Sequence, residues 1–331
     1  MAGGAPTFSF IVLSYQSGDY LRGCLESLFA QAGDDYEVIL TDNASGDGAP
    51  QAAVASFPTL KFVDNGANLG YAGGNNAAAR TARGRWLCFI NPDVVAEADW
   101  LKVMRAAIAD FSQTRLFTSL QIDPVRPDHL DGAGDGMTAF GFPFRMGYGQ
   151  ARPEDLRVSE VFSPCGAAFV IEHSLFETLG GFDERFFLYC EDADLGYRAR
   201  LRGEATLLIP EAVVGHVGSA TLGARSDVAL YHGYRNRIWL YAKNTPASVM
   251  ALTIVPHIVF SLCVALKDVW KGRGSVVMRA LRDALDGMGA VMRDRQYVQT
   301  TRSLSAGALL RQLTWNPRVI LRRGLDLRRP K

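Results

Sequence analysis

Short apolar runs alternate with amphipathic stretches of helical period along the first third of the chain. Phe8 to Leu13 is an apolar run of strand-forming residues, and the spacing of apolar positions from Tyr20 to Phe29 predicts a helix after it. The alternation repeats, predicting strands at Tyr36 to Thr41, Leu60 to Val63 and Trp86 to Ile90, with helices near 49–57 and 73–83. This order is typical of a mostly parallel sheet with helices on both faces, where ligands bind beyond the carboxyl ends of the strands.

Later elements follow the same pattern less regularly. A helix at Ala98 to Phe111 and a strand near Leu116 to Gln121 precede residues 123–153, which are rich in Gly, Pro and Asp and show no period. We expect this segment to be a mobile loop region beside the binding site. The remaining predicted elements are a strand near Ala167 to Ile171, a helix after Glu191, a strand at Ala205 to Ile209 and helices from Tyr231 onward.

Length and composition favour more than one compact unit. The chain has 331 residues, 48% hydrophobic and 21% charged, so it can bury a large core and exceeds the usual size of one domain. We expect one half of an α/β domain at 1–122, its other half at 123–245, and a basic helical region at 246–331. Five cysteines lie far apart without a CxxC pair, which predicts reduced, mostly buried thiols.

Charge is distributed unevenly along the chain. Residues 271–331 carry 14 Lys and Arg against 4 Asp, a net charge of +10, so the formal net charge of +1 leaves −9 on residues 1–270. Such a basic segment favours anionic surfaces, namely lipid head groups, lipid-linked phosphates or nucleic acid. The alternative is a solvated helical face.

One uncharged stretch is long enough to cross a membrane. No charged residue occurs between Lys243 and Lys267, and Ala247 to Leu266 has the length of a span. Pro256 and His257 at its centre predict an interrupted helix with an imidazole at mid-depth, so we expect a buried or membrane-surface helix instead. The chain starts without the basic and apolar regions of a secretory signal, which predicts a cytoplasmic protein.

Three carboxylates follow an aromatic run and open a predicted helix. Glu191, Asp192 and Asp194 lie at the start of that helix, where backbone N–H groups hold a carboxylate and apolar neighbours raise its pKa. One interpretation is a positioned general base, and the other is a capping cluster. Asp194 is expected to be structural, pairing with Arg198 one turn on.

Polar loops after the early strands offer further ligands. Asp42 could accept hydrogen bonds from a base or ribose, or form an Asx turn. The Gly/Asn loop 68–76 would let backbone amides approach a phosphate, but it lacks the GxGxxG spacing and a Walker lysine, which argues against a dinucleotide cofactor. Asp93, in an Asn-Pro-Asp turn, could hold Mg²⁺ or Mn²⁺, and His216 could add a nitrogen ligand that favours Mn²⁺. A plain turn and an ordinary histidine hydrogen bond are the alternatives.

Taken in order, these motifs resemble glycosyltransferase family 2, the inverting enzymes with a GT-A fold, over roughly residues 7 to 245. The likeness is greatest to the rhamnosyltransferase-like branch. The matching segments are Ile11-Val-Leu-Ser-Tyr-Gln16, Thr41-Asp-Asn-Ala-Ser-Gly-Asp47, Asn68-Leu-Gly-Tyr-Ala-Gly-Gly-Asn-Asn76, Asn91-Pro-Asp93, Gly166-Ala-Ala-Phe-Val170, Gly181 to Leu195, His216 and Arg235-Asn236. The resemblance implies a Rossmann-like GT-A sheet with a C-terminal helical appendage.

The resemblance also implies roles for individual residues. Asp192 would be the catalytic base, with Asp93 and His216 at a metal-diphosphate site for Mg²⁺ or Mn²⁺. A nucleotide site would comprise Ser14, Tyr15, Asp42, Asn68, Gly70, Asn75, Asn91 and Asp93, and an acceptor or diphosphate site Gly166, Glu191, Arg235 and Asn236, with Arg235 near the phosphates. Two positions depart from the family: Asn91 replaces the first Asp of a DxD motif, and Gln16 replaces a commoner Asn.

The implied activity is an inverting transfer of a sugar, with L-rhamnose from dTDP-rhamnose as the preferred donor, in bacterial cell-surface polysaccharide synthesis. The implied partners are a dTDP- or UDP-linked donor and a glycan or polyprenyl-diphosphate-linked acceptor at the inner face of the cell membrane, without nucleic acid. A homodimer is left open. Two alternatives remain. A sugar nucleotidyltransferase would need a basic residue in the loop 14–18, which has none, and an inactive binding protein would explain Asn91.

Overall fold

One mixed sheet organises the N-terminal two thirds of the molecule. The computed structural model describes residues 5–218 and 226–330. Four parallel strands form one half in the order β4-β1-β2-β3, with β1 at Phe8–Ser14, β2 at Tyr36–Asp42, β3 at Lys61–Asp64 and β4 at Trp86–Ile90. The prediction of strands alternating with helices and of a largely parallel first half is confirmed.

The other half of the sheet begins with one reversed strand beside β4, after which β6 and β12 resume the direction of β4. Strand β11 runs antiparallel between β4 and β6, and β12 lies parallel to β6. Short strands pair with this half at its edges: β5 and β10 with β12, and β7 with β6. The bounds are Val94–Ala96 for β5, Leu116–Ile122 for β6, Leu130–Gly132 for β7, Ser159–Val161 for β10, Ala168–Glu172 for β11 and Thr206–His216 for β12.

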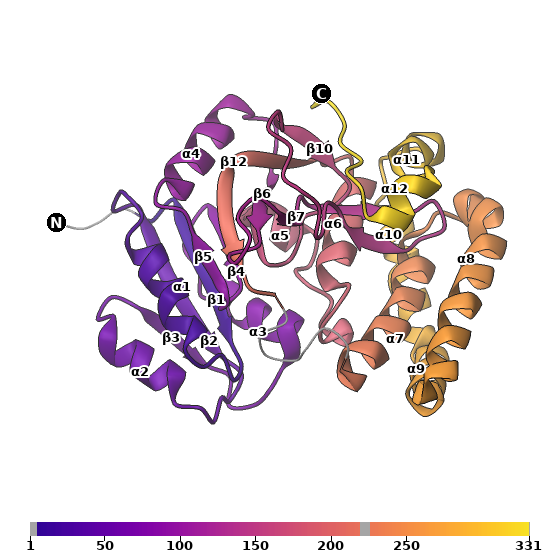
Figure 1. Cartoon of the computed structure of the whole chain (residues 1–331), viewed down its shortest axis with the longest axis horizontal. Coiled ribbons are helices and arrows are strands. Elements are labelled where there is room, and N and C mark those ends of the chain that lie inside the picture. Colours follow the sequence, from indigo (N-terminus) through magenta and orange to yellow (C-terminus); the bar gives the residue numbers. More distant parts are fainter. Residues whose placement is uncertain (1–4, 219–225, 331) are drawn as a thin grey trace.

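Helices cover both faces of the sheet, as the pattern predicted (Figure 1). Alternate residues of each strand point to opposite faces, so Phe10 joins one buried cluster and Ile11 the other. The first face packs against α1 (Tyr20–Phe29), α2 (Ala49–Ser56) and α4 (Trp100–Asp110), and the second against α3 (Gly70–Ala79), α5 (His173–Thr178) and α6 (Glu191–Leu201). A 3₁₀ turn, η1 (Glu184–Phe186), precedes α6.

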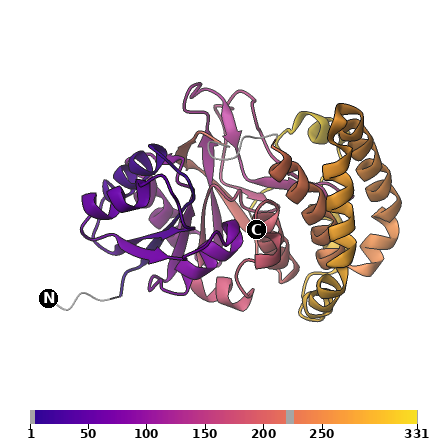
Figure 2. The same cartoon turned by 90° about the horizontal axis from the view of Figure 1, so that it is seen from below.

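The C-terminal helices stack at one end of this domain (Figures 1 and 2). They share a buried cluster with α6, in which Trp239 and Leu240 pack with Phe186 and Tyr197. The appendage is therefore built into the core. Its elements are α7 (Asp227–Asn244), α8 (Ala247–Asp268), the π-helical turn η2 (Val269–Arg273), α9 (Gly274–Asp286), α10 (Met288–Thr300), α11 (Ala306–Gln312) and α12 (Pro317–Arg322).

Helix α8 runs through Pro256 without a break, so the predicted interruption is wrong. Its uncharged stretch is long and apolar enough to cross a membrane, by length and composition. One side of the helix is fixed to the protein: Val249, Thr253 and His257 are buried, and His257 Nδ1 lies 2.7 Å from the Phe140 carbonyl oxygen. Most of the remaining surface of α8 is exposed.

Residues 123–153 are packed, so the expected mobile loop is also wrong. Besides β7 they form a hairpin of β8 (Asp135–Met137) and β9 (Pro143–Arg145). Met137 is fully buried, and its carbonyl accepts a hydrogen bond from the Thr314 N–H. The physical reason is that the strands of this segment are only three residues long and pair partly with distant residues, among them Ser163 and Thr314, which leaves no local period.

Candidate active site

A cavity of about 1120 Å³ lies at the carboxyl edge of the sheet and extends to the C-terminal helices. Its walls include the loop after β4, the end of β12, the start of α6, the β8–β9 hairpin and parts of α7 and α8. Asp93 and Asp192, ninety-nine positions apart in sequence, both line it. The topology thus brings the two carboxylates that the sequence singled out to one hollow.

Strand register brings His216 to Asp93. His216 at the end of β12 pairs with Val94 of β5, the residue directly after Asp93. His216 Nε2 therefore lies 3.4 Å from Asp93 Oδ1, and His216 Nδ1 lies 2.6 Å from Asp131 Oδ2. Burial alone would lower the pKa of His216, but the hydrogen bonds to Asp131 and Asp93 outweigh it and raise that pKa above its ordinary value.

Asp93 and His216 offer two of the donor atoms that a divalent metal ion requires, and the remaining donors would have to come from a bound substrate and water. Asp131 fixes the imidazole through Nδ1, which leaves Nε2 facing the Asp93 carboxylate, as in histidines that bind metals. Within the described residues, no group of three or more His, Cys, Asp or Glu side chains could hold a metal ion. Asp93 and His216 thus fit a divalent cation whose other ligands come from phosphate oxygens and water.

Asp192 is held by backbone amides at the start of α6. Its Oδ2 accepts a hydrogen bond from the Gly166 N–H at 2.8 Å, and its Oδ1 accepts one from the Ala193 N–H at 2.7 Å. A Cβ at Gly166 would lie 2.7 Å from Oδ2, so only glycine allows this approach. Burial raises the pKa of Asp192, although these backbone hydrogen bonds favour its ionised form and lower it.

The neighbouring carboxyl groups of Glu191 and Asp135 do not share the two backbone hydrogen bonds that favour ionisation of Asp192. Burial and the charge of Asp192 raise the pKa of both Glu191 and Asp135 well above their ordinary values. In the described part of the chain, Glu191 Oε2 and Asp135 Oδ1 have no hydrogen-bond partner. Amide stabilisation therefore favours Asp192 as the carboxylate that ionises first in this cluster, which suits a general base.

The aromatic run before α6 is shaped by Asn236. The backbone takes positive φ at Phe187, Tyr189 and Cys190, so the chain turns sharply into the helix. The amide nitrogen of Asn236 lies 2.7–2.9 Å from three carbonyl oxygens of residues 186, 188 and 189. Asn236 thus supports the loop that delivers Glu191 and Asp192, and it does not line the cavity.

Arg235 also lies outside the cavity wall, whereas the resemblance implied a place near the phosphates. Its Nη2 donates hydrogen bonds to the carbonyls of Arg185 and Phe186, and its guanidinium lies 4.4 Å from the centre of the Trp239 ring. These contacts tie α7 to η1 and hold the charge away from the hollow.

The residues expected to bind nucleotide divide into two groups. Tyr15, Asn68, Gly70 and Asn91 line the cavity, as do Gly166 and Glu191 from the acceptor set. Three others are used within the protein and do not line it: Ser14 Oγ is 3.1 Å from Ser17 Oγ, Asp42 accepts from the Ser45 N–H and hydroxyl, and Asn75 donates to the Tyr71 carbonyl. For Asp42 the structure has the Asx turn that was the alternative.

Several cavity residues had no signal in the sequence. Asp135 and Arg145 lie in the segment without a period, and Asp131, the partner of His216, lies there too. Arg237, Lys267 and Lys271 come from helices that were predicted only by their apolar pattern.

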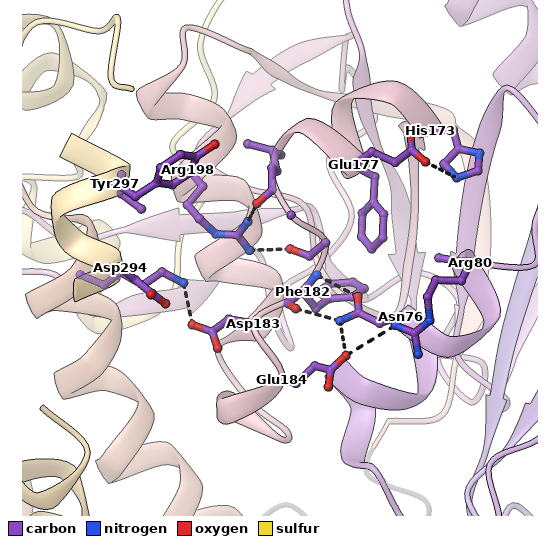
Figure 3. Close-up of a pocket in the computed structure, with 17 residues that line it drawn as sticks. Asn76, Arg80, His173, Glu177, Phe182, Asp183, Glu184, Arg198, Asp294 and Tyr297 are labelled. Atoms are coloured by element: carbon purple, nitrogen blue, oxygen red, sulfur yellow. Dashed lines mark hydrogen bonds and ion pairs between the residues drawn. The ribbon is translucent and has the colours of Figure 1, made fainter. Parts of the chain in front are cut away.

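Asp194 has the structural role expected of it. It is fully buried, its Oδ2 lies 2.7 Å from Arg198 Nε and 3.0 Å from Lys243 Nζ, and its Oδ1 accepts from Asn244. The predicted pairing with Arg198 is confirmed. Arg198 and Lys243 also border a separate cleft of about 630 Å³ between the sheet domain and α10, shown in Figure 3.

Charged side chains in that cleft pair with one another. Lys243 Nζ lies 2.8 Å from Asp183, Arg80 3.8 Å from Glu184, and His173 3.8 Å from Glu177 (Figure 3). Arg198 turns its guanidinium to the carbonyls of Leu179 and Gly181. The charged groups of the cleft are thus used in ion pairs within the protein, and the candidate catalytic and metal-binding residues lie in the larger cavity.

A GT-A-like sheet that carries the Asp192 carboxylate and the Asp93–His216 pair to one cavity is the framework of a nucleotide-sugar-dependent transferase. Residues 9–178 match the Glycosyl transferase family 2 profile. The chain belongs to this family and is a glycosyltransferase.

Relatives support this assignment. The chain is 31% identical over 249 residues to the N-acetylglucosaminyl-diphospho-decaprenol L-rhamnosyltransferase of Mycobacterium tuberculosis, covering 67% of this chain and 80% of that protein. It is 27% identical over 218 residues to rhamnosyltransferase WbbL of Escherichia coli K12, covering 60% and 79%. Its fold is similar to that of the mannosyltransferase PcManGT from Pyrobaculum calidifontis, solved with GDP-Man and Mn²⁺, with a TM-score of 0.54 and 18% identity over 90% of this chain and 86% of that one.

Proposed function

We propose that the protein transfers L-rhamnose from a dTDP- or UDP-linked donor to a hydroxyl group of a glycan carried on a polyprenyl diphosphate, with inversion at the anomeric carbon. The observation that carries this proposal is the convergence of Asp93, His216 and Asp192 on one cavity. The sugar and the lipid-linked acceptor are proposed because the Mycobacterium tuberculosis relative is named for both, and the Escherichia coli relative for rhamnose transfer.

In the proposed reaction Asp192 removes the proton from the acceptor hydroxyl as that oxygen attacks the anomeric carbon. The bond between that carbon and the diphosphate oxygen breaks, and the nucleoside diphosphate leaves from the opposite face. A divalent cation held by Asp93 and His216 would neutralise the charge on the leaving diphosphate. The solved Pyrobaculum neighbour contains Mn²⁺, which supports a divalent metal here.

Asp93→Ala tests the metal site. The variant should weaken Mn²⁺-dependent binding of dTDP-rhamnose by at least about 10- to 100-fold. That is the usual cost of removing a residue that only hydrogen-bonds a metal ligand, and removing a ligand itself should cost no less. Titration calorimetry with Mn²⁺ and with EDTA measures this. Asp99→Ala, which removes an exposed carboxylate on α4's N-terminal side, is the matched control. Unchanged metal-dependent binding in Asp93→Ala, or no release of nucleoside diphosphate by the wild type with donor, metal and acceptor, contradicts the proposal.

We further propose that α8 rests on the inner face of the cell membrane. Exposed apolar side chains line its outer surface, with Leu252 and Val255 67% exposed and Leu266 66% exposed. Trp270, in the turn after α8, is 89% exposed, the position of an interfacial anchor. The opposite side of α8 is fixed by buried residues, so the helix suits the membrane surface better than a span.

Vesicle binding tests the membrane contact. The double variant Leu262→Glu with Leu266→Glu should reduce co-sedimentation with anionic vesicles more than about tenfold, because two exposed apolar side chains are lost and two negative charges gained. Deleting residues 271–331 is a poorer test, since Val291, Leu309 and Leu313 belong to the core. Val125→Glu, at a position 86% exposed, is the control. Equal sedimentation of all three proteins would exclude the contact.

A further inference from the structure

The cavity has two ends of opposite charge. Asp93, Asp135, Glu191 and Asp192 gather where the sheet meets α6, together with the cation Arg145, whose guanidinium is paired with Asp131 at 2.7 Å. The other end is lined by α7, α8 and the η2 turn, and its charged residues are Arg237, Lys267, Lys271 and Arg273, with Asp268 the one carboxylate among the described residues there. The Asp268 carboxylate accepts a hydrogen bond from the Tyr234 hydroxyl at 2.8 Å. Cations therefore dominate this end.

Arg237 is the most informative of these cations. Its guanidinium lies 4.7 Å from the centre of the Tyr234 ring and 4.9 Å from that of Phe142, so two aromatic side chains hold it in place. Across residues 5–218 and 226–330, no carboxylate lies within ion-pair distance of it. The guanidinium is half-buried, is held by two aromatic rings, bonds the Tyr234 hydroxyl and feels the charge of Asp268 only from beyond ion-pair distance. It is therefore suited to an anion that enters the cavity.

Two lysines extend this charge to the surface. Lys267 and Lys271 are exposed and lie on either side of the α8–η2 junction, and both line the cavity. Leu266 and Trp270, directly before each lysine, belong to the exposed apolar surface of α8 and its following turn. The basic end of the cavity thus borders the surface proposed to rest on the membrane.

We infer that this basic end, formed by Arg237, Lys267 and Lys271, binds the diphosphate of an amphiphilic, polyprenyl-diphosphate-linked acceptor, with the lipid chain leaving along α8. The inference rests on the proposed function and assigns the acceptor substrate to the basic end of the cavity. Phosphate oxygens match both the guanidinium fork and the two ammonium groups. The cavity volume of about 1120 Å³ exceeds that of most single-ligand pockets, which leaves room for a donor at the acidic end and an acceptor at the basic end.

The nucleotide-sugar donor also contains a diphosphate. Binding of the donor diphosphate and of the acceptor diphosphate can be distinguished because only the former should depend on a metal ion. The acidic end needs a cation to hold a diphosphate, whereas the basic end does not. Detergent-solubilised geranylgeranyl diphosphate in EDTA is therefore the probe, with geranylgeraniol as the matched lipid without charge and dTDP in EDTA as the matched nucleotide. The wild type should bind the diphosphate lipid at least about tenfold more tightly than either of the others.

The double variant Lys267→Gln with Lys271→Gln should weaken this binding by roughly 10- to 30-fold, because each substitution removes a positive charge from the surface that would contact the diphosphate. Arg237→Lys, which keeps the charge and loses the fork, should weaken it less than Arg237→Gln. Lys102→Gln removes an exposed charge on α4 and is the control. Donor binding with Mn²⁺ should stay unchanged in the double lysine variant, which also reports that it is folded.

Equal binding of the diphosphate lipid by the wild type and the double lysine variant, with Mn²⁺-dependent donor binding intact, overturns the acceptor site and leaves the proposed function standing. Binding of the alcohol as tight as that of the diphosphate also overturns it. A wild type that binds no donor with Mn²⁺ and releases no nucleoside diphosphate contradicts the proposed function itself.

Discussion

Asp192→Asn is expected to lower the turnover number by about 10²- to 10⁴-fold and to leave the affinity for the donor nearly unchanged. The amide keeps the shape of the side chain and its place beside Gly166, whose N–H lies 2.8 Å from Oδ2 in the wild type. It cannot take a proton from the acceptor hydroxyl. The loss should therefore fall on the chemical step, measured as nucleoside diphosphate released under saturating substrates.

Asp135→Asn is the matched control for this experiment. Burial raises the pKa of Asp135 well above its ordinary value, so Asp135 is a poorer base than the amide-stabilised Asp192, and an amide of the same shape preserves its packing. We expect turnover within about tenfold of the wild type. Equal losses in Asp135→Asn and Asp192→Asn, or normal turnover in Asp192→Asn, would remove Asp192 from its role as base.

The dependence of kcat/KM on pH also tests whether Asp192 is the base. The pKa of Asp192 is raised, mainly by burial, and a base acts only when ionised. The kcat/KM value should therefore rise with pH through an apparent pKa above the ordinary value for Asp and level off on the alkaline side of it. Loss of this acidic limb in Asp192→Asn, with residual activity independent of pH there, identifies the group.

Asp194→Ala is expected to lower the free energy of unfolding by about 3–5 kcal/mol, because truncating one member of a buried ion cluster strands its partners. Arg198 would lose its carboxylate partner and Lys243 one of its two, the other being Asp183, at positions where the Arg198 and Lys243 side chains are 8% and 4% exposed. Urea denaturation followed by circular dichroism measures the change.

Asp294→Ala is the control for that measurement. Asp294 pairs with Arg185 near the surface, where its side chain is 44% exposed, and such pairs contribute about 0–1 kcal/mol. Arg198 and Lys243 lower the pKa of Asp194 in spite of its burial, so its stabilisation is present above the pKa of an unfolded Asp and is lost as the pH falls through the depressed folded value. A loss under 1 kcal/mol in Asp194→Ala would contradict this account.

The alternation of strands and helices along the chain, the sheet covered on both faces and the gathering of loops at its carboxyl edge could be predicted from the sequence, because they follow from local periodicity. Asp93 could be suspected because it follows a buried strand directly. The contact between Asp93 and His216 could not be derived, since it depends on β5, a strand of three residues, and on a register shift between Ile209 and Val213 within β12.

Residues with long-range partners escaped prediction for the same reason. Asp131 and Asp135 lie in a segment whose pairing is completed by residues 314–328, and Arg237 differs from Arg235 only in the side of α7 that it occupies. The helical pattern of α7 could not distinguish them, because both faces of this helix are partly covered. A proline usually interrupts a helix, but α8 continues through Pro256 because Val249 and Thr253 before it and His257 after it are packed against the protein.

The bridges that join Thr138 to Thr314 and Glu160 to Arg328 bear on how the protein matures. The parallel strands β1 to β4 can pair while the ribosome is still translating, since all of their partners emerge early. The hairpin that carries Asp135 can pair early with Ser163, but its bridge to Thr314 and the bridge of β10 to Arg328 form only at the end of synthesis. Nascent chains should therefore complete the four parallel strands first and the cavity wall that holds Asp135 last.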